Sequence, residues 1–127
     1  MLRVFIADDS LGFGTLASAW LEAHEDMEVV GAARSAPDAL ASLADARPDV
    51  VILDRLLPQP EHSDAVLAFV RERLPEAAVL LISGMPDEEL GDVARLAGAE
   101  GHVSKAANAQ ALADAVRRVA AARRPQA

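Results

Sequence analysis

Short apolar segments alternate with longer, more polar segments along this chain. The apolar segments are rich in Val, Leu, Ile and Ala, and polar or charged residues follow most of them. Runs of this kind are typical of strands that are buried on both faces of a parallel sheet. We therefore predict strands at residues 2–7, 29–33, 50–53, 78–82 and 101–103.

Apolar residues recur at spacings of three and four positions between and after the predicted strands. This period places them on one side of an amphipathic helix, which can cover a face of the sheet. Five such stripes are present: Phe13, Leu16, Trp20 and Leu21; Ala39, Leu40 and Leu43; Val66, Phe69 and Val70, with Arg73 at a polar edge; Leu90, Val93, Ala94 and Ala97; and Leu112, Ala115, Val116 and Val119.

Proline and glycine mark the boundaries between these elements. Pro48 and Pro75 follow the second and third predicted helices, because the residue before a proline is disfavoured in the helical conformation. Pro86 opens the fourth helix and Gly98 closes it. Repeated strand-helix-strand units with short connections predict one α/β domain, a five-stranded parallel sheet with right-handed crossovers and five helices on both faces.

The composition narrows the classes of function. The net charge of −8, from 12 basic and 20 acidic residues, repels phosphate backbones, so we expect no direct nucleic-acid binding by this domain. The chain has no cysteine, which excludes disulfides and thiolate metal sites. The start of the chain is too acidic for a signal peptide, and the apolar runs fall short of the ~20 residues of a membrane helix. We therefore expect a cytoplasmic protein without a membrane partner.

Basic residues gather near the C-terminus, at Arg117, Arg118, Arg123 and Arg124. Their placement is favourable near the negative end of a last helix, which is the interpretation we prefer. The alternative is that they begin a linker to a further domain.

Polar residues stand where four of the predicted strands end: Asp8 and Asp9, Asp54, Ser83 and Lys105. Each has an ordinary structural explanation when taken alone, such as a helix cap, a turn or a solvated charge. In an open parallel sheet, however, the carboxyl ends of the strands share one edge, where ligands bind. Polar residues at the ends of four strands of one sheet are therefore better explained by a common site than by four separate structural roles.

The charges at this edge indicate a metal. Two carboxylates about 4 Å apart repel by about 4 kcal/mol at an effective dielectric constant near 20, so three of them require a compensating cation. Mg²⁺ is the natural candidate, because it prefers oxygen ligands and is commonly held by one or two carboxylates together with a phosphate. The histidines His24, His62 and His102 lack the close spacing of a zinc site.

These residues resemble the receiver domain of bacterial two-component response regulators. The resemblance covers almost the whole chain and rests on Asp8-Asp9, Asp54 with Pro58 four residues later, Ser83-Gly84 and Lys105. The segments Ile6-Ala-Asp-Asp-Ser10, Glu28-Val-Val-Gly31, Arg47-Pro-Asp-Val-Val-Ile-Leu-Asp54 and Gly101-His-Val-Ser-Lys105 are similar to receivers that carry a C-terminal helix-turn-helix output domain. The resemblance implies a flavodoxin-like fold with strand order 2-1-3-4-5, a receiver domain over residues 1–122, and a tail or linker over residues 123–127.

The resemblance also implies a role for each site residue. Asp54 is expected to accept a phosphoryl group from a phosphohistidine on a sensor histidine kinase or phosphotransfer protein. Asp9, Asp54 and the backbone carbonyl of Leu56 are expected to bind Mg²⁺ directly, and Asp8 through a water molecule. Lys105 is expected to pair with the phosphoryl oxygens.

Two further residues are implied to act in switching. Ser83 is expected to donate its hydroxyl to the phosphoryl group and to move inward, which shifts the surface of the last two helices and the last strand. His102 stands at the switch position, where the family usually has Tyr or Phe. A homodimer on activation is possible on this surface. The domain is expected to catalyse only its own phosphorylation and dephosphorylation, so it is not an enzyme in the usual sense.

The chain departs from the family pattern at three places. Besides His102, Ala106 follows Lys105 where Pro or Asp is usual, and the expected loop at residues 59–64 contains no glycine. Each departure concerns the switching or docking surface, whereas the residues of the phosphorylation chemistry are all present.

Three functions from different classes remain open. The chain could be a receiver that signals by binding a protein partner, or the receiver part of a DNA-binding transcription regulator. It could also be a Mg²⁺-dependent phosphohydrolase of the haloacid dehalogenase type, which also uses a nucleophilic Asp. That pattern requires a second Asp two residues after the nucleophile, where this chain has Leu56, so we rank it last.

Overall fold

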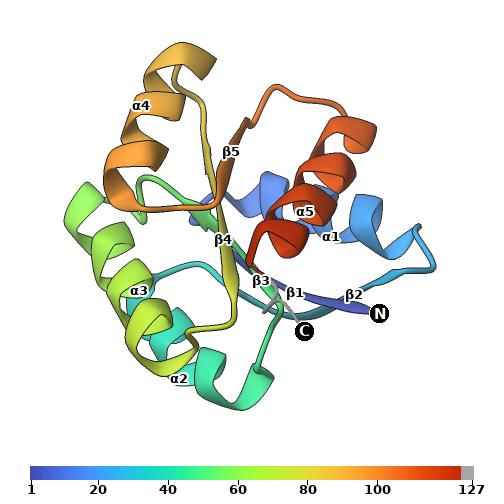
Figure 1. Ribbon diagram of the computed structural model, residues 1–127, viewed down its shortest axis with the longest axis horizontal. Helices are drawn as coiled ribbons and strands as arrows, with labels where there is room; N and C mark the ends of the chain where they lie inside the picture. Colours follow the sequence, from blue (N-terminus) through green and yellow to red (C-terminus); the bar gives the residue numbers. More distant parts are fainter. Residues whose placement is uncertain (124–127) are drawn as a thin grey trace.

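The computed structural model describes residues 1–123. It contains a five-stranded parallel sheet with strand order β2-β1-β3-β4-β5, and a helix follows every strand (Figure 1). This confirms the predicted α/β class and the flavodoxin-like strand order. The elements are β1 (Leu2–Ala7), α1 (Leu11–Glu22), β2 (Met27–Ala33), α2 (Ala36–Ala46), β3 (Val50–Asp54), α3 (Pro60–Arg73), β4 (Ala78–Ser83), α4 (Asp87–Ala97), β5 (Gly101–Ser104) and α5 (Ala109–Arg123).

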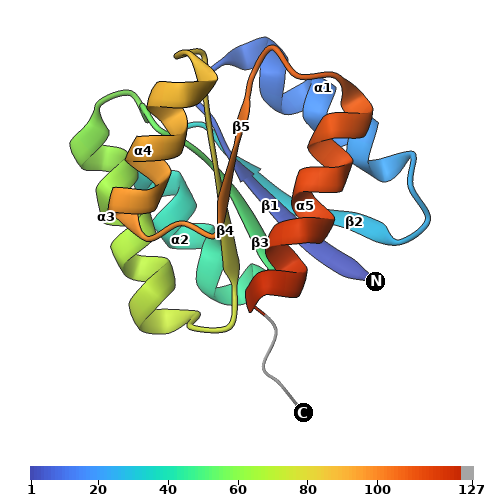
Figure 2. The same cartoon turned by 45° about the horizontal axis from the view of Figure 1, so that its top comes forward.

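The sheet lies between two layers of helices (Figure 2). Successive side chains of a strand point to opposite faces, so Val4 and Ile6 of β1 pack with α1 and α5. Phe5 and Ala7 of the same strand pack with α2, α3 and α4 on the other face. The three inner strands are buried along nearly their full length, as the apolar runs predict.

The two edge strands differ from the prediction. Strand β2 begins at Met27, two residues earlier than predicted, and most of its residues are partly or fully exposed. Strand β5 has only one buried residue, Val103. An edge strand has a neighbour on one side only, and the helices cover it less completely than they cover the inner strands. Burial on both faces is therefore a property of β1, β3 and β4 alone.

Helix α1 packs on the sheet with most of the predicted stripe, because Phe13 and Trp20 contact the core, but Leu16 does not belong to it. Ala17 and Leu21 are fully buried, whereas Leu16 is 46% exposed. Ala17 and Leu21 are four positions apart and lie one above the other on the helix. Leu16 lies one position away from this row, and therefore about a quarter of a turn from the sheet.

Two glycines are required by the local geometry. A Cβ on Gly31 of β2 would lie 2.8 Å from the ring of Phe5, at the irregular register between β1 and β2. Gly98 has φ +79° and ends α4, as predicted, because this left-handed conformation is strained for other residues.

The segment predicted as a loop at residues 59–64 is mostly helical, because α3 already begins at Pro60. Proline is well suited to the first turn of a helix, where its missing N–H removes no hydrogen bond. The loop between Asp54 and α3 is therefore short and requires no glycine.

Glu100 binds both arginines that flank it in space. Its carboxylate accepts hydrogen bonds from Arg71 of α3 at 2.8 Å and from Arg123 of α5 at 3.3 Å, and from the amide of Val79 at 2.7 Å. Arg123 also donates to the carbonyl oxygen of Pro75. The described part of α5 extends to Arg123, the first residue of the segment predicted as a tail or linker. Arg124 and the rest of the predicted tail lie outside the described residues.

Candidate metal centre and active site

Three carboxylates meet at the carboxyl edge of the sheet. Asp8 and Asp9 follow β1, and Asp54 is the last residue of the neighbouring strand β3. One oxygen of each lies within 4.8 Å of the others. Asp8 and Asp54 are buried, with 2% and 3% of their surface exposed. The sequence therefore predicted this juxtaposition correctly.

Lys105 reaches into the same cluster from the turn after β5. Its ammonium nitrogen lies 2.9 Å from Asp54 Oδ2 and 3.0 Å from Asp8 Oδ2. The backbone of Lys105 is fixed as well, because its amide donates to the carbonyl oxygen of Ser83 at 3.0 Å. Lys105 therefore supplies the positive charge that partly balances the acidic cluster.

The protonation of this pair reflects burial and pairing together. Burial raises the pKa of the Asp54 carboxyl, and the hydrogen bonds from Lys105 and from the amide of Leu56 offset only part of this effect. Burial would lower the pKa of the Lys105 ammonium, but hydrogen bonds and charge from Asp54 and Asp8 outweigh it and raise that pKa. The ammonium is therefore firmly charged, while the buried carboxylate lacks full compensation.

The donor set fits a divalent cation such as Mg²⁺. All three groups are carboxylates, and hard cations prefer oxygen ligands. Asp8 Oδ2 is buried and makes no hydrogen bond of good geometry; only the Lys105 ammonium lies beside it. Asp8 Oδ1 is occupied by the amide of Ser10 at 2.6 Å. A cation held by Asp8, Asp9 and Asp54 would satisfy the remaining oxygens and reduce the repulsion among them.

Leu56 and Ser83 lie next to this cluster. The amide of Leu56 donates to Asp54 Oδ1 at 3.1 Å, which holds the carboxylate in one orientation. Ser83 ends β4, is buried, and accepts a hydrogen bond from the amide of Met85 at 3.2 Å. The β3 residue Asp54 is paired with Ile82, directly before Ser83. A role for the Leu56 carbonyl as a metal ligand and for Ser83 as a switch stays a prediction.

His102 lies on β5 and faces helix α4. Its Nε2 is 3.4 Å from Asp87 Oδ1 in the first turn of α4, and 32% of the side chain is exposed. The ring also covers Gly91, where a Cβ would lie 3.2 Å from it. His102 therefore does not join the acidic cluster in this conformation. It contacts α4, which is part of the surface expected to shift on phosphorylation.

Sequence patterns indicate no part in the site for Ser10, Phe13 or Asp87, and they place Phe13 only in the apolar stripe of α1. Ser10 Oγ accepts a hydrogen bond from the Lys105 ammonium at 2.9 Å, and the ring of Phe13 lies 5.4 Å from the same nitrogen. The available signal for Ser10 was its position directly after Asp8-Asp9. No sequence signal pairs Asp87 with His102, because their contact depends on how α4 packs on β5.

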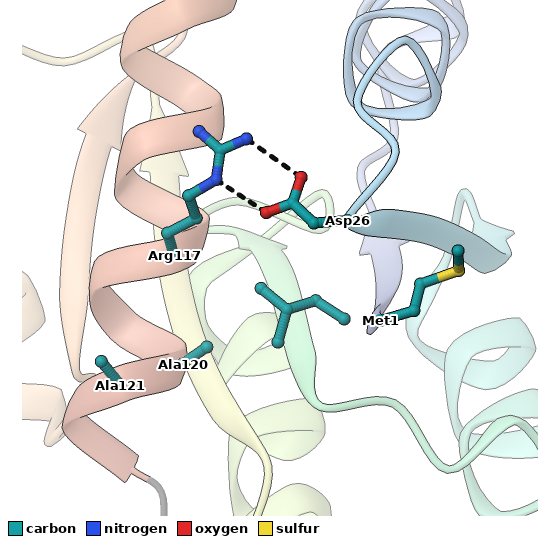
Figure 3. Close-up of a pocket in the computed structure, with 6 residues that line it drawn as sticks. Met1, Asp26, Arg117, Ala120 and Ala121 are labelled. Carbon is teal, nitrogen blue, oxygen red and sulfur yellow. Dashed lines mark hydrogen bonds and ion pairs between the residues drawn. The ribbon is translucent and has the colours of Figure 1, made fainter.

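A second feature lies at the opposite end of the sheet. A pocket of about 260 Å³ is lined by the start of β1 and by α5, and Arg117 crosses it to Asp26 with two hydrogen bonds of 2.9 and 3.0 Å (Figure 3). The same arginine reaches His24 at 3.1 Å. Arg117 is thus a structural contact between α5 and the loop before β2. It lies in the middle of α5, and among the described residues only Arg123 stands in the last turn, where the helix dipole favours a positive charge.

A carboxylate cluster with a lysine, at the carboxyl edge of a sheet of order 2-1-3-4-5, is the arrangement of a receiver domain. The chain matches the response regulator receiver domain family over residues 4–117. It belongs to this family. Domains of this class are signalling modules and are generally not classical enzymes.

Two relatives are each about one third identical to this chain. The chain is 34% identical over 118 residues to the oxygen regulatory protein NreC of Staphylococcus epidermidis, covering 93% of this chain and 54% of that protein. It is 34% identical over 123 residues to the DNA-binding transcriptional activator DevR/DosR of Mycobacterium tuberculosis, covering 97% of this chain and 56% of that protein. The chain therefore spans about half the length of these relatives.

Solved structures agree with the fold. The signal receiver domain of the response regulator NarL from Mycobacterium tuberculosis superimposes with a TM-score of 0.83 at 29% identity, covering 96% of this chain and 98% of that one. Among the described residues, no helix is long and apolar enough to cross a membrane.

Proposed function

We propose that this chain is the phosphoacceptor of a two-component phosphorelay and that Asp54 is the residue phosphorylated. The observation that carries the proposal is the contact of Asp54 with Lys105 inside the three-carboxylate cluster. Membership of the receiver family supports a sensor histidine kinase or a phosphotransfer protein as the donor.

The transfer is an in-line exchange at phosphorus. A carboxylate oxygen of Asp54 forms a bond to the phosphorus atom, while the bond from phosphorus to the donor histidine nitrogen breaks and its electron pair returns to the imidazole. Mg²⁺ bound by Asp9, Asp54 and the Leu56 carbonyl, with Asp8 acting through water, would neutralise charge on the phosphoryl oxygens. Lys105 adds a positive charge to the same oxygens.

The outcome of phosphorylation is a change of surface. Ser83 directly follows the β4 residue that pairs with Asp54, so its hydroxyl is well placed to follow a new phosphoryl group. Its movement would pull on the loop before α4, where the Met85 amide is bonded to it. His102 on β5 contacts the first turn of α4 and would respond to that movement. The switched surface is therefore α4, β5 and α5.

Two outputs fit this surface. The first is the binding of a protein partner, including a second copy of the chain. The second is control of a DNA-binding domain on the same polypeptide, which is favoured by the relatives: DevR/DosR is a DNA-binding transcriptional activator, and the chain corresponds to about half of it. The acidic receiver itself is not expected to contact DNA. We also expect the protein to act in the cytoplasm, where its phosphodonors are.

One experiment tests both the phosphorylated residue and the class of protein. The protein is incubated with Mg²⁺ and a small phosphodonor such as acetyl phosphate, and the modified residue is mapped by mass spectrometry. We expect one phosphoryl group on Asp54, and none without Mg²⁺. Steady turnover of an external phosphate ester, with the aspartyl phosphate formed and hydrolysed in every cycle, would instead support the hydrolase alternative.

A further inference from the structure

Ser10 occupies the N-cap position of α1 but does not cap the helix. Its backbone is extended, as at a usual N-cap, yet its side chain makes no hydrogen bond to the amides of the first turn. Ser35 at the start of α2 shows the ordinary arrangement, with its hydroxyl accepting from the Asp38 amide at 3.3 Å. The Ser10 hydroxyl is turned instead toward Lys105, 2.9 Å away.

Three oxygens surround the Lys105 ammonium: two accept hydrogen bonds from it, and the third pairs with it as an ion. They are Asp54 Oδ2 at 2.9 Å, Asp8 Oδ2 at 3.0 Å and Ser10 Oγ at 2.9 Å. The ring of Phe13, one turn further along α1, lies 5.4 Å from the nitrogen. The start of α1 thus contacts the ammonium with both a hydroxyl and an aromatic ring.

The Ser10 hydroxyl differs from the two carboxylate oxygens because the proposed reaction leaves it chemically unchanged. Phosphorylation converts the Asp54 carboxylate into an acyl phosphate, and a bound cation would attract the Asp8 carboxylate. Neither process uses the Ser10 hydroxyl, which is neutral and lies on a helix fixed to the sheet by Ala17 and Leu21. Ser10 Oγ is therefore the partner that Lys105 can keep while its other bonds change.

We propose that Ser10 is a positioning residue for phosphoryl transfer, because its hydroxyl holds the Lys105 ammonium beside Asp54. This inference rests on the proposed phosphoacceptor function. Without the hydroxyl, one N–H of the ammonium has no protein partner, and the side chain is less well confined when phosphorus arrives. Since positioning governs this type of chemistry, the rate of transfer falls although every reacting group is present.

The test measures phosphorylation by acetyl phosphate at saturating Mg²⁺ and donor, for wild type, Ser10→Ala, Ser10→Thr and Ser35→Ala. We expect Ser10→Ala to lower the rate roughly three- to tenfold, the effect of one typical hydrogen bond, and Ser10→Thr to restore it. Ser35→Ala should do the reverse, lowering the denaturation midpoint and leaving the rate unchanged. A Ser10→Ala protein that loses stability and keeps its rate is merely a capping variant, which would overturn the inference.

A double-mutant cycle with Lys105→Ala locates the effect. If Ser10 acts through Lys105, Ser10→Ala has no further effect on the rate in the Lys105→Ala background. An equal loss in both backgrounds would show that Ser10 acts elsewhere. Mg²⁺ affinity, measured by calorimetry without any phosphodonor, should stay the same in Ser10→Ala, because the Ser10 amide still binds Asp8. A loss of affinity as large as the loss of rate would place the effect at the metal and refute the inference.

The proposed function is checked in the same series. If wild type gains no phosphoryl group on Asp54, the phosphoacceptor assignment is wrong and the rate comparison has no basis. If wild type is phosphorylated there and Ser10→Ala is equally fast, only the role of Ser10 is wrong.

Discussion

The imidazole of His102 lies 3.4 Å from the carboxylate of Asp87, and this contact joins the last strand of the sheet to the first turn of α4. Protonation of the ring would strengthen the contact, because a cation then faces an anion. Inward movement of the ring toward Ser83 would give up this partner and bury the ring, which costs more for the charged form.

We therefore expect acidification to disfavour the active conformation. The measurement is partner binding or dimer formation of the phosphorylated protein from mildly acidic to mildly basic pH, for wild type and His102→Phe. Two identical pH profiles would show that His102 is an exposed histidine without a titrating role. Asp87→Asn should weaken the pH dependence without removing it.

Asp54→Asn should abolish phosphorylation by acetyl phosphate. An amide is neither a nucleophile at phosphorus nor an anionic metal ligand, while its size preserves the packing around the end of β3. Intact-protein mass spectrometry checks the result, and circular dichroism confirms that the variant is folded. Phosphorylation at the wild-type rate would mean that another residue is the acceptor.

Asp9→Ala should weaken Mg²⁺ binding and raise the stability of the metal-free protein. The two effects share one cause: the cluster loses one of three negative charges, which attract the cation and repel one another. Calorimetric titration gives the affinity, and urea denaturation with a chelator gives the stability. Unchanged affinity would count against Asp9 as a ligand. Asp45→Ala, an exposed carboxylate of α2 outside the cluster, is the matched control.

Dimerisation on activation is expected across α4 and α5, which carry both acidic and basic side chains. The structure changes the details of this prediction. Arg95 pairs with Asp92 at 3.1 Å within α4, and Arg117 pairs with Asp114 and Asp26, so these charges have partners inside the monomer. Arg118 is exposed and is the better candidate for a contact across a two-fold axis. Sedimentation with and without beryllofluoride, for wild type and Arg118→Glu, tests the idea, and an unchanged monomer would end it.

The Asp26-Arg117 pair should make stability depend on pH in the acid range. The hydrogen bond from Arg117 holds the pKa of Asp26 below its ordinary value of 3.8. A carboxyl with a lowered pKa stabilises the fold above its ordinary pKa, and this contribution is lost as the pH falls through the lowered value.

Urea denaturation of wild type and Asp26→Asn gives the difference in stability at each pH. The difference should be constant above about pH 5 and should shrink below pH 4, where both proteins carry a neutral group. It should also shrink with added salt, because the pair is exposed. A difference that stays the same down to pH 3 would mean that the charge of Asp26 is not responsible.

The sequence predicts that the site residues lie close together, because a parallel sheet places the ends of its strands at one edge. Once residues 2–7, 50–53 and 78–82 are assigned as neighbouring strands, Asp8, Asp54 and Ser83 must share one edge. The contact between Ser10 and Lys105 could not be predicted in this way. A serine before a helix has an ordinary role as a cap, and only the rotamer shows that it contacts the lysine instead.

The misassignment of Leu16 has a different origin. Leu16 and Ala17 both continue an apolar stripe in α1, and hydrophobicity alone favours the larger side chain as the core residue. The structure buries Ala17, because a small side chain lets the helix approach the sheet, and leaves Leu16 46% exposed. Periodicity identifies the helix, but interhelical and helix-sheet distances decide which of two adjacent rows faces inward.

Helix α5 connects two poles of the molecule. It starts just after the turn that carries Lys105 and runs for 15 residues, about 22 Å, to Arg123 near the opposite end of the sheet. There Arg123 is clamped to Glu100 and to the Pro75 carbonyl, and Arg117 is bound to Asp26. With its far end fixed, the helix can respond to events near Lys105 by tilting about that clamp, but it cannot slide along its own axis without breaking these bonds. A displacement at the acidic edge would thus change the tilt of α5 relative to the sheet slightly, while the position of its C-terminal end stays the same.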